Sequence, residues 1–349
     1  MPNQLFVSII IPVHNAEEFT ERCLDALLSS TYPSFEIIVA DDCSTDDRIA
    51  VNHQKRITLL RLSEHSGPSA ARNFGAQHAR GDILMFIDSD VIVRRETLSM
   101  VVADFLNNPG VAAVFGSYDD KPAKGNFISQ YRNLFHHFHH QCSDTEAFTF
   151  WGGCGAVRKQ VFIDMGGFDQ KRYKKPSIED IELGYRLRKK GYRILLNKDL
   201  QVKHLKQWTF LSMVRTDIFQ RAIPWSRLIL EEKWMPKDLN LQMSYKISAI
   251  STVLILLLIP ILLLDHAIYC AIPINSIACI FSLMLFVTIL ILNRKIYFFY
   301  ARKRGVSFML KVLPFHLVYY LYSSMSFAYC WITHKTATFG SLLFNGKLK

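Results

Sequence analysis

The chain is poor in paired cysteines. Its seven cysteines are scattered, and none forms a Cys-x-x-Cys pair. This spacing excludes the common zinc ribbons and zinc fingers, and it favours buried thiols in a reducing compartment. A basic segment followed by a long apolar run is also missing from the first residues. We therefore expect no signal peptide and a cytoplasmic N-terminal domain.

Acidic residues are scarce in the last third of the chain. Residues 237–349 contain eleven Lys and Arg against two acidic residues, which leaves 30 against 28 in residues 1–236. Most of the net charge of +11 therefore belongs to the C-terminal third. Because this basic excess accompanies long apolar runs, it indicates attraction to a lipid bilayer surface. The near-neutral N-terminal part lacks a basic arm, which argues against a nucleic acid partner.

Charge is absent from three long stretches near the C-terminus. They hold 18, 28 and 23 residues: Ile247–Leu264, His266–Asn293 and Val312–His334. Each is long enough to cross a hydrocarbon core of ~30 Å at ~1.5 Å per residue. The sequence thus predicts about three transmembrane helices at about 245–264, 267–292 and 312–333, in a multi-pass protein of the inner (plasma) membrane. Pro314 and His316 leave an interfacial or re-entrant pair open as the alternative for the third.

Basic residues set the predicted orientation of these helices. Arg294-Lys295 and Arg302-Lys303-Arg304 fall between the second and third stretches, so this loop is expected to face the cytoplasm. Residues 207–243 mix Arg and Trp with aliphatic residues, which is typical of interfacial amphipathic helices. The predicted domains are therefore 1–206, 207–243 and 244–349.

The first 206 residues alternate between strand and helix patterns. Predicted strands are Leu5–Val13, Phe35–Ala40, Ile57–Leu62, Ile83–Ile87, Val111–Phe115, Tyr192–Leu196 and Leu200–Val202. Predicted helices begin near Asn15, Gly67, Glu96, Asn126 and Ser177. This alternation predicts an α/β fold with a mostly parallel, Rossmann-like sheet. Asn15 and Glu18 have the spacing of a capping box for the first helix.

Carboxylates follow two of the predicted strands. Asp88-Ser89-Asp90 ends one strand, and Asp41-Asp42 ends another. The ends of parallel strands meet at one edge of a sheet, where open α/β sheets bind ligands. Carboxylate oxygens suit Mg²⁺ or Mn²⁺, which neutralise a diphosphate. The alternative to a metal site, for either acidic pair, is a turn exposed to solvent with no binding role.

Further polar residues are predicted to face the same crevice. Gly67 precedes a helix N-terminus, which favours phosphate, and Arg72 follows on that helix. Asp180, beside Glu179 at a helix start, is a candidate general base, although acidic residues there also complement the helix dipole. His204 is a candidate metal ligand through neutral imidazole, and Gly153 a point of close backbone approach.

The histidine run His136–His140 lies in a predicted helix. Helical spacing places His136 and His140 on one face, but no carboxylate partner is apparent in the sequence. We expect a helix that lines an acceptor entrance rather than a zinc hydrolase site.

Together these motifs resemble the ordered signature of family 2 glycosyltransferases with the GT-A fold. The residues that carry the resemblance are Ser8–Asn15, Val39–Asp46, Gly67–Asn73, Asp88–Asp90, Gly166–Asp169 and Glu179-Asp180. The resemblance covers about residues 5–205, and it implies a nucleotide-sugar donor, a divalent metal and inversion at the anomeric carbon.

The resemblance also implies roles for individual residues. Asp41 would read the base, Asp88 and Asp90 would serve ribose, diphosphate and metal, and Asp180 would be the base. His204 would complete the metal site. The expected donor-binding set is Pro12, His14, Asn15, Asp41, Asp42, Gly67, Arg72, Asp88, Ser89, Asp90, Gly153 and Glu179.

Some residues depart from the family pattern. His14 stands where an aromatic residue often stacks on the base, and Ala40 precedes Asp41 where Val or Asp is more usual, but neither change is disabling. The Gln-x-x-Arg-Trp motif of processive polysaccharide synthases is missing from His204–Trp208, which argues against chain polymerisation. We therefore expect a membrane lipid acceptor, such as polyprenyl phosphate or a glycolipid. A processive synthase, a lipid nucleotidyltransferase and a non-catalytic scaffold are the alternatives. Self-association into a homo-oligomer is left open.

Overall fold

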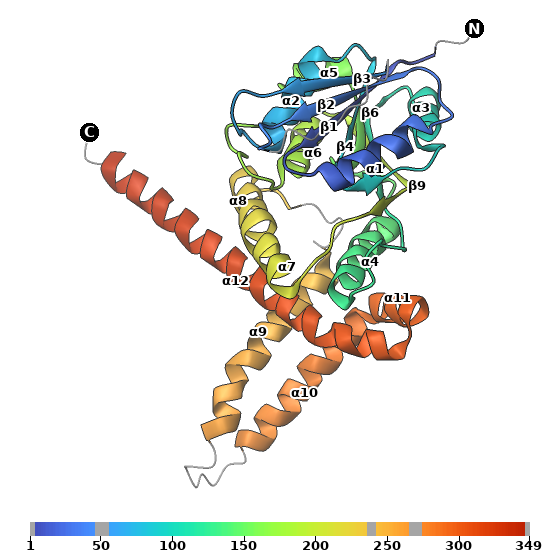
Figure 1. Ribbon diagram of the computed structural model, residues 1–349. Helices are drawn as coiled ribbons and strands as arrows, with labels where there is room; N and C mark the ends of the chain where they lie inside the picture. The colour runs from blue at the N-terminus through green and yellow to red at the C-terminus, as the bar shows by residue number, and fades with distance from the viewer. Residues whose placement is uncertain (1–3, 46–55, 236–241, 265–273, 346–349) are drawn as a thin grey trace. The chain divides into compact units, whose positions relative to one another are not determined.

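The computed structural model describes residues 4–45, 56–235, 242–264 and 274–345. The chain divides into two compact units, Met1–Met213 and Val214–Lys349. The first unit is an α/β domain, and the second consists of helices (Figure 1). The predicted boundaries at 206 and 243 remain predictions.

The first unit alternates strands and helices. Its strands are β1 (Val7–Val13), β2 (Phe35–Asp41), β3 (Ile57–Arg61), β4 (Ile83–Ile87), β5 (Val91–Ile92), β6 (Val111–Tyr118), β7 (Glu146–Ala147), β8 (Cys154–Arg158) and β9 (Arg193–His204). Its helices are α1 (Glu17–Leu28), α2 (Pro68–His78), α3 (Thr97–Asn107), α4 (Phe127–Cys142), α5 (Lys159–Asp164) and α6 (Glu179–Lys189), and α7 (Phe210–Thr216) runs into the second unit.

One mixed sheet organises this unit. Its order is β3-β2-β1-β4-β8-β6-β9-β5, with β7 paired to β9. Strands β3, β2, β1 and β4 are mutually parallel, whereas β8 runs antiparallel to both β4 and β6. The predicted α/β class with a mostly parallel sheet is confirmed. The antiparallel β8 was not predicted, because the paired glycines in Phe148–Val157 suggest a bulge or a close backbone approach to a ligand.

Two hydrophobic clusters cover the two faces of the sheet. Ile9 and Ile11 of β1 point into one cluster, and Ile10 between them points into the other, as the two-residue period of a strand requires. Helices α1 and α3 pack on the first face, and α2, α5 and α6 on the second (Figure 1). Burial on both sides explains why the strands are continuous apolar runs.

Two local predictions were wrong. The capping box does not form: the residue before α1 is Ala16, and Asn15 adopts a left-handed backbone conformation with φ 49°. Its side chain is held elsewhere, since the amide oxygen of Asn15 accepts a hydrogen bond from the Thr45 N–H at 2.9 Å. The two short strands predicted after Tyr192 are one strand, β9, which pairs along β6 with irregularities in register.

The second unit continues with helices. They are a π-helical turn (Asp217–Ala222), α8 (Ile223–Glu232), α9 (Met243–Leu264), α10 (Ile274–Leu292), α11 (Arg294–Arg304) and α12 (Val306–Asn345). A buried polar cluster joins α9 and α12 to Asn293, the residue between α10 and α11: the Asn293 side chain donates to the Ser248 hydroxyl at 2.8 Å and accepts from Tyr320 at 2.7 Å. The basic segment predicted as a loop is helix α11, because Arg, Lys and Tyr all tolerate a helix.

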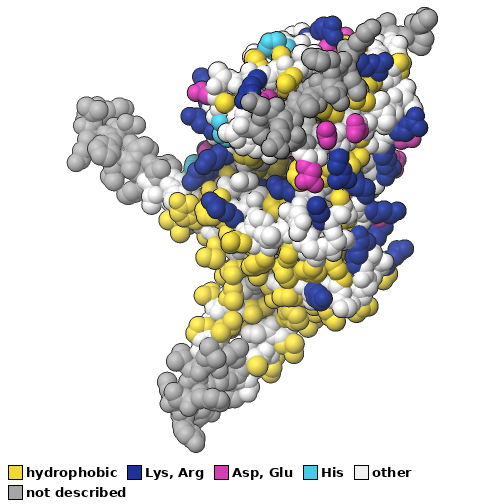
Figure 2. Space-filling view, in the orientation of Figure 1, with side chains coloured by type: hydrophobic (Ala, Val, Ile, Leu, Met, Phe, Trp, Pro, Cys, Tyr) yellow, Lys and Arg dark blue, Asp and Glu magenta, His cyan; other side chains and the backbone are white. Residues whose placement is uncertain are grey.

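Part of the predicted membrane region forms a helix of the length and hydrophobicity that a membrane span requires. Met243–Pro260 in α9 is long and apolar enough to cross a bilayer, and α10 with α11 would make a second span, bent by 64°. Hydrophobic side chains cover the visible surface of α9 and α10 (Figure 2). Of the three predicted stretches, the start of the second, 267–273, lies outside the described residues. The third lies in α12, which does not pass the same test over its described part.

Candidate functional site

The carboxyl ends of β1, β2 and β4 meet at one edge of the sheet. In the parallel register Val13 of β1 pairs with Asp41 of β2, and Ile10 pairs with Phe86 of β4. His14, Asp42 and Asp88 therefore leave the sheet on the same side, as expected for the end of parallel strands. Pro12 sits in β1 beside Ala40, one residue short of this edge.

The first acidic pair, Asp41-Asp42, is buried and engaged by the protein itself. Asp41 accepts hydrogen bonds from the N–H and the hydroxyl of Ser44, at 3.0 and 2.5 Å, and pairs with Arg61 at 3.3 Å. Asp42 accepts from the backbone N–H groups of Ser66 and Gly67, at 2.7 and 2.8 Å. Each carboxylate thus shapes the loop next to it. The expected role of Asp41 in reading a base remains a prediction.

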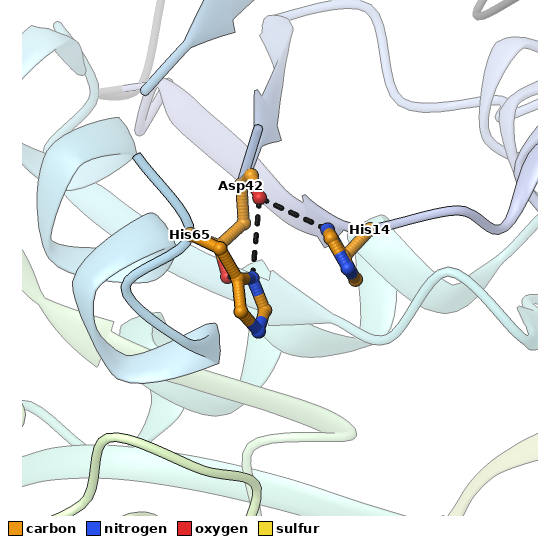
Figure 3. A group of neighbouring side chains, drawn as sticks. All are labelled: His14, Asp42 and His65. Carbon is orange, nitrogen blue, oxygen red and sulfur yellow. Dashed lines mark hydrogen bonds and ion pairs between the residues drawn. The ribbon is translucent and has the colours of Figure 1, made fainter. Parts of the chain in front are cut away.

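Two histidines flank Asp42. His65 places its Nδ1 2.9 Å from the Asp42 carboxylate, and the His14 Nδ1 lies 3.0 Å from the Asp42 carbonyl oxygen. The two rings stack with centroids 4.0 Å apart (Figure 3). His65 was not singled out in the sequence, because nothing in its neighbourhood marks it as a partner of a residue 23 positions earlier.

Gly67 stands directly before helix α2 with φ 90°. A Cβ at this position would lie 2.1 Å from the carbonyl oxygen of Lys174, so another residue would need a backbone shift. The strained turn presents the N-terminus of an eleven-residue helix, an arrangement that suits anionic groups.

Arg72 joins two parts of the site. From the first turns of α2 its guanidinium donates to Asp88 at 2.7 Å and to Glu179 at 2.8 Å, and it is 6% exposed. Burial alone would lower the pKa of Arg72, but the two carboxylates outweigh it and raise the pKa further. The cation is therefore permanently charged and ties the end of β4 to the start of α6.

Asp180 is held next to this ion-pair network. Its Oδ2 accepts a hydrogen bond from the Gly152 N–H at 2.9 Å, and its Oδ1 accepts from the Ile181 N–H at 2.8 Å. A Cβ on Gly152 would lie 3.4 Å from the Asp180 Cβ and 3.8 Å from the Arg72 guanidinium carbon. Burial raises the pKa of Asp180 to about 6, and the nearby Glu179 carboxylate acts in the same direction. A carboxylate tuned in this way is suited to accept a proton near neutral pH.

Asp90 faces His204. The His204 Nε2 lies 3.4 Å from the Asp90 carboxylate, and the Leu205 N–H donates to the Asp90 carbonyl oxygen at 2.8 Å. Burial raises the pKa of Asp90, but the His204 hydrogen bond and the charges of His204 and Lys206 more than offset it, so the pKa is lowered. The ring of Tyr118 stacks on His204 with centroids 4.3 Å apart. Tyr118 was missed in the sequence, because its register against β9 is a tertiary feature.

The remaining expected residues lie around these groups. Ser89 is half-buried between Asp88 and Asp90, and the Gly153 carbonyl accepts from the Asp88 N–H at 3.3 Å. The Trp151 ring covers Gly153, where a Cβ would come within 2.5 Å of it. The structure thus brings Arg72, Asp88, Gly153, Glu179 and Asp180 into one connected cluster.

The histidine run of α4 attaches this helix to β6. His137 and His140 place their Nδ1 atoms 2.7 and 3.0 Å from the backbone oxygens of Tyr118 and Gly116. Burial lowers the pKa of His140 to about 4, so its ring is neutral. His136 and His140 share one face, as predicted, and contact Trp151 there. The expected acceptor entrance remains a prediction.

This fold and this edge of the sheet define a class of protein. A mixed, mostly parallel sheet, acidic residues at the strand ends and a helix N-terminus beside them form an α/β domain of the GT-A kind. Residues 8–166 match the sequence model described as glycosyl transferase family 2. Over these residues the chain therefore matches the family 2 glycosyltransferases, as the motifs had predicted.

A relative with a similar sequence agrees with the match to glycosyltransferases. An uncharacterized glycosyltransferase of Haemophilus influenzae is 34% identical over 131 residues, which cover 36% of this chain and 52% of the relative. The chain thus spans about half the length of this relative.

Solved structures share the fold at lower sequence identity. The mannosyltransferase PcManGT from Pyrobaculum calidifontis, in complex with GDP-Man and Mn²⁺, aligns with a TM-score of 0.56 and 19% identity over 94% of this chain and 88% of its own. S. aureus TarS 1–349, in complex with UDP-GlcNAc, aligns with a TM-score of 0.50 and 20% identity over 70% of each chain.

Proposed function

We propose that this protein is a membrane-anchored, metal-assisted, inverting glycosyltransferase. It transfers a sugar from a UDP-sugar or a GDP-sugar to a membrane lipid. The observation that carries the proposal is the Arg72 bridge. It links Asp88, at the end of β4, to Glu179, the neighbour of the candidate base Asp180. A donor-side carboxylate and a proton acceptor are thereby held in one cluster.

A nucleotide diphosphate fits the edge formed by β1, β2 and β4. The N-terminus of α2 and the charge of Arg72 favour the phosphates, and the turn at Gly67 leaves no side chain in the way. His14, Asn15, Asp41 and Asp42 lie toward the nucleoside. Two structures of the same fold are described as complexes with GDP-Man and with UDP-GlcNAc, which supports a nucleotide-sugar donor.

Asp90 and His204 would hold a divalent metal. The pair combines a carboxylate with an imidazole, a donor set that suits Mn²⁺ and, through the carboxylate, Mg²⁺. Asp88 is turned toward Arg72, so a metal would have to compete with this cation for the Asp88 oxygen atoms. When bound, such an ion neutralises the charge of the departing nucleoside diphosphate.

Asp180 performs the proton transfer. Its ionised carboxylate takes the proton from an acceptor hydroxyl, and the hydroxyl oxygen attacks C1 of the sugar from the face opposite the phosphate. The new C1–oxygen bond forms as the C1–phosphate oxygen bond breaks, so the nucleoside diphosphate leaves and the anomeric centre inverts. The Gly152 and Ile181 N–H groups keep the carboxylate oriented. With a phosphate acceptor no base is needed, and Asp180 then only positions it.

The acceptor is assigned to a lipid because of the second unit. Its described residues include one helix apolar enough to span a bilayer and a second candidate in α10 with α11, and its sequence carries most of the net positive charge of the chain. Trp and Arg in residues 207–236 suit a headgroup region. A polymer-extending synthase is less well supported, because His204–Trp208 lacks the Gln-x-x-Arg-Trp motif.

The test is sugar transfer to lipid by the full chain. The purified protein is mixed with lipid extract, Mn²⁺ or Mg²⁺, and radiolabelled UDP- or GDP-sugars, and label is measured in the organic phase. We expect transfer by the wild type and by the control Asp164→Ala, which changes an exposed residue of α5. Asp90→Ala should lower transfer about 10²–10³-fold. Full transfer by Asp90→Ala would refute the site, and label found only in water-soluble product would refute the lipid acceptor.

A further inference from the structure

The stacked histidines His14 and His65 beside Asp42 take no part in the chemical step of the proposed transfer, although His14 and Asp42 also belong to the proposed donor site. Among the described residues, His14, Asp42 and His65 form the group of three possible ligands whose ligand atoms all lie within 4.8 Å of one another. Asp42 is buried, whereas both histidines are exposed. Asp88, Asp90 and His204 form no comparably close set, since Asp88 is drawn to Arg72.

Hydrogen bonds fix the orientation of both rings. The Asn15 amide oxygen accepts from the Thr45 N–H, so its amide nitrogen is the atom that lies 3.4 Å from the His14 Nε2. The His14 Nε2 therefore accepts, and the His14 Nδ1 carries the proton that bonds to the Asp42 carbonyl oxygen at 3.0 Å. The His65 Nδ1 lies 2.9 Å from the Asp42 carboxylate, which selects the same tautomer.

This tautomer leaves a lone pair on the outer nitrogen of each ring. On His14 that lone pair faces the Asn15 amide nitrogen at 3.4 Å, a weak contact that a metal ion would displace. The rings are nearly parallel, with an interplanar angle of 25°. Figure 3 shows one nitrogen of each ring bonded to Asp42 and the second nitrogen directed away from it. A carboxylate or carbonyl behind each imidazole is the usual support of a metal-binding histidine, because it fixes the tautomer and makes the other nitrogen more basic.

We propose that His14 and His65 form a binding site for a divalent transition-metal ion of the zinc class, with Asp42 as the residue that orients both rings. Two imidazoles prefer Zn²⁺, Ni²⁺ or Cu²⁺ over Mg²⁺, in contrast to the carboxylate-containing pair Asp90 and His204. Zinc–nitrogen bonds are about 2.0–2.1 Å long, so the outer nitrogens of both exposed side chains would have to turn toward a shared ion.

The site would link two segments of the chain. His14 leaves β1, and His65 lies in the segment that leads to α2, two residues before Gly67. Both rings also contact Asp42, whose carboxylate accepts hydrogen bonds from the Ser66 and Gly67 N–H groups. An ion shared by the two rings would therefore stabilise the turn at the N-terminus of α2. This inference does not depend on the sugar-transfer reaction.

The test measures zinc binding directly. The full chain is stripped with chelator, and Zn²⁺ is titrated into it by calorimetry in the Asp90→Ala background, which lacks the other proposed ligand pair. We expect one ion per chain. His14→Ala and His65→Ala should each weaken binding at least about tenfold, which is about 1.4 kcal/mol. His78→Ala is the matched control, because His78 is an exposed histidine that bonds only within α2.

A further measurement separates metal binding from a structural effect. Zn²⁺ should raise the unfolding temperature of the parent and of His78→Ala, but not that of the His14→Ala/His65→Ala double variant. Equal zinc affinity in the parent and the double variant, with circular dichroism spectra that match, would overturn the proposal.

Discussion

Two acidic motifs end neighbouring parts of the same sheet, and the structure uses them differently. The side chains of Asp41 and Asp42 are 4% and 3% exposed, and backbone N–H groups hold both: Asp41 accepts from Ser44, and Asp42 accepts from Ser66 and Gly67. The side chains of Asp88 and Asp90 are 32% and 21% exposed, and each pairs with another side chain, Arg72 or His204. The first motif therefore fixes the backbone at the edge of the sheet, whereas the second keeps carboxylate atoms open to solvent.

The largest expected effect separates chemistry from architecture. Asp180→Asn keeps the size of the side chain but removes the proton acceptor, so transfer to a hydroxyl acceptor should fall about 10³-fold. The Asn amide can accept from only one of the two N–H groups, Gly152 and Ile181, so the free energy of unfolding should fall by about 1–3 kcal/mol, and transfer is compared at a temperature where both proteins are folded. Wild-type transfer should also fall about tenfold per pH unit below about 6, because the pKa of Asp180 is raised to about 6 and the protonated form is inactive.

Rates measured from pH 5 to 8, with Asp164→Ala as the control, check both statements. A rate that persists unchanged at pH 5, or in Asp180→Asn, would mean that Asp180 only positions the acceptor.

The next effect falls on the first acidic motif. Asp42→Ala leaves the N–H groups of Ser66 and Gly67 without their acceptor, so we expect it to lower the free energy of unfolding by about 2–4 kcal/mol. Urea denaturation of the full chain measures the loss. Asp90→Ala serves as the comparison and should change stability much less. If both variants lose the same stability, the contrast between the two motifs is wrong.

The contrast also marks how far the sequence could be interpreted. The strands and their order along the chain can be predicted from apolar runs such as Ile83–Ile87. Burial on both faces of the sheet requires such a run, and the run is visible in the sequence. The acidic residues, Arg72 and Gly67 could be selected as site residues from the sequence, because the chemistry of each residue type alone suggests a role. Their partners could not: His65 reaches Asp42, and Tyr118 reaches His204, through tertiary packing alone. Asn15 misled because its side chain bonds to Thr45 across a turn instead of to its own helix.

The smallest expected effect concerns Arg61, the outer partner of Asp41. Its side chain is 49% exposed, and its Nε lies 3.3 Å from the carboxylate, so solvent screens the ion pair. Asp41 also keeps both hydrogen bonds from Ser44 when this arginine is removed. Arg61→Ala should therefore lower the free energy of unfolding by less than about 1 kcal/mol, and added salt should reduce the difference further. A loss as large as that of Asp42→Ala in the same urea titration would show that Asp41 depends on this cation more than on its hydrogen bonds from Ser44.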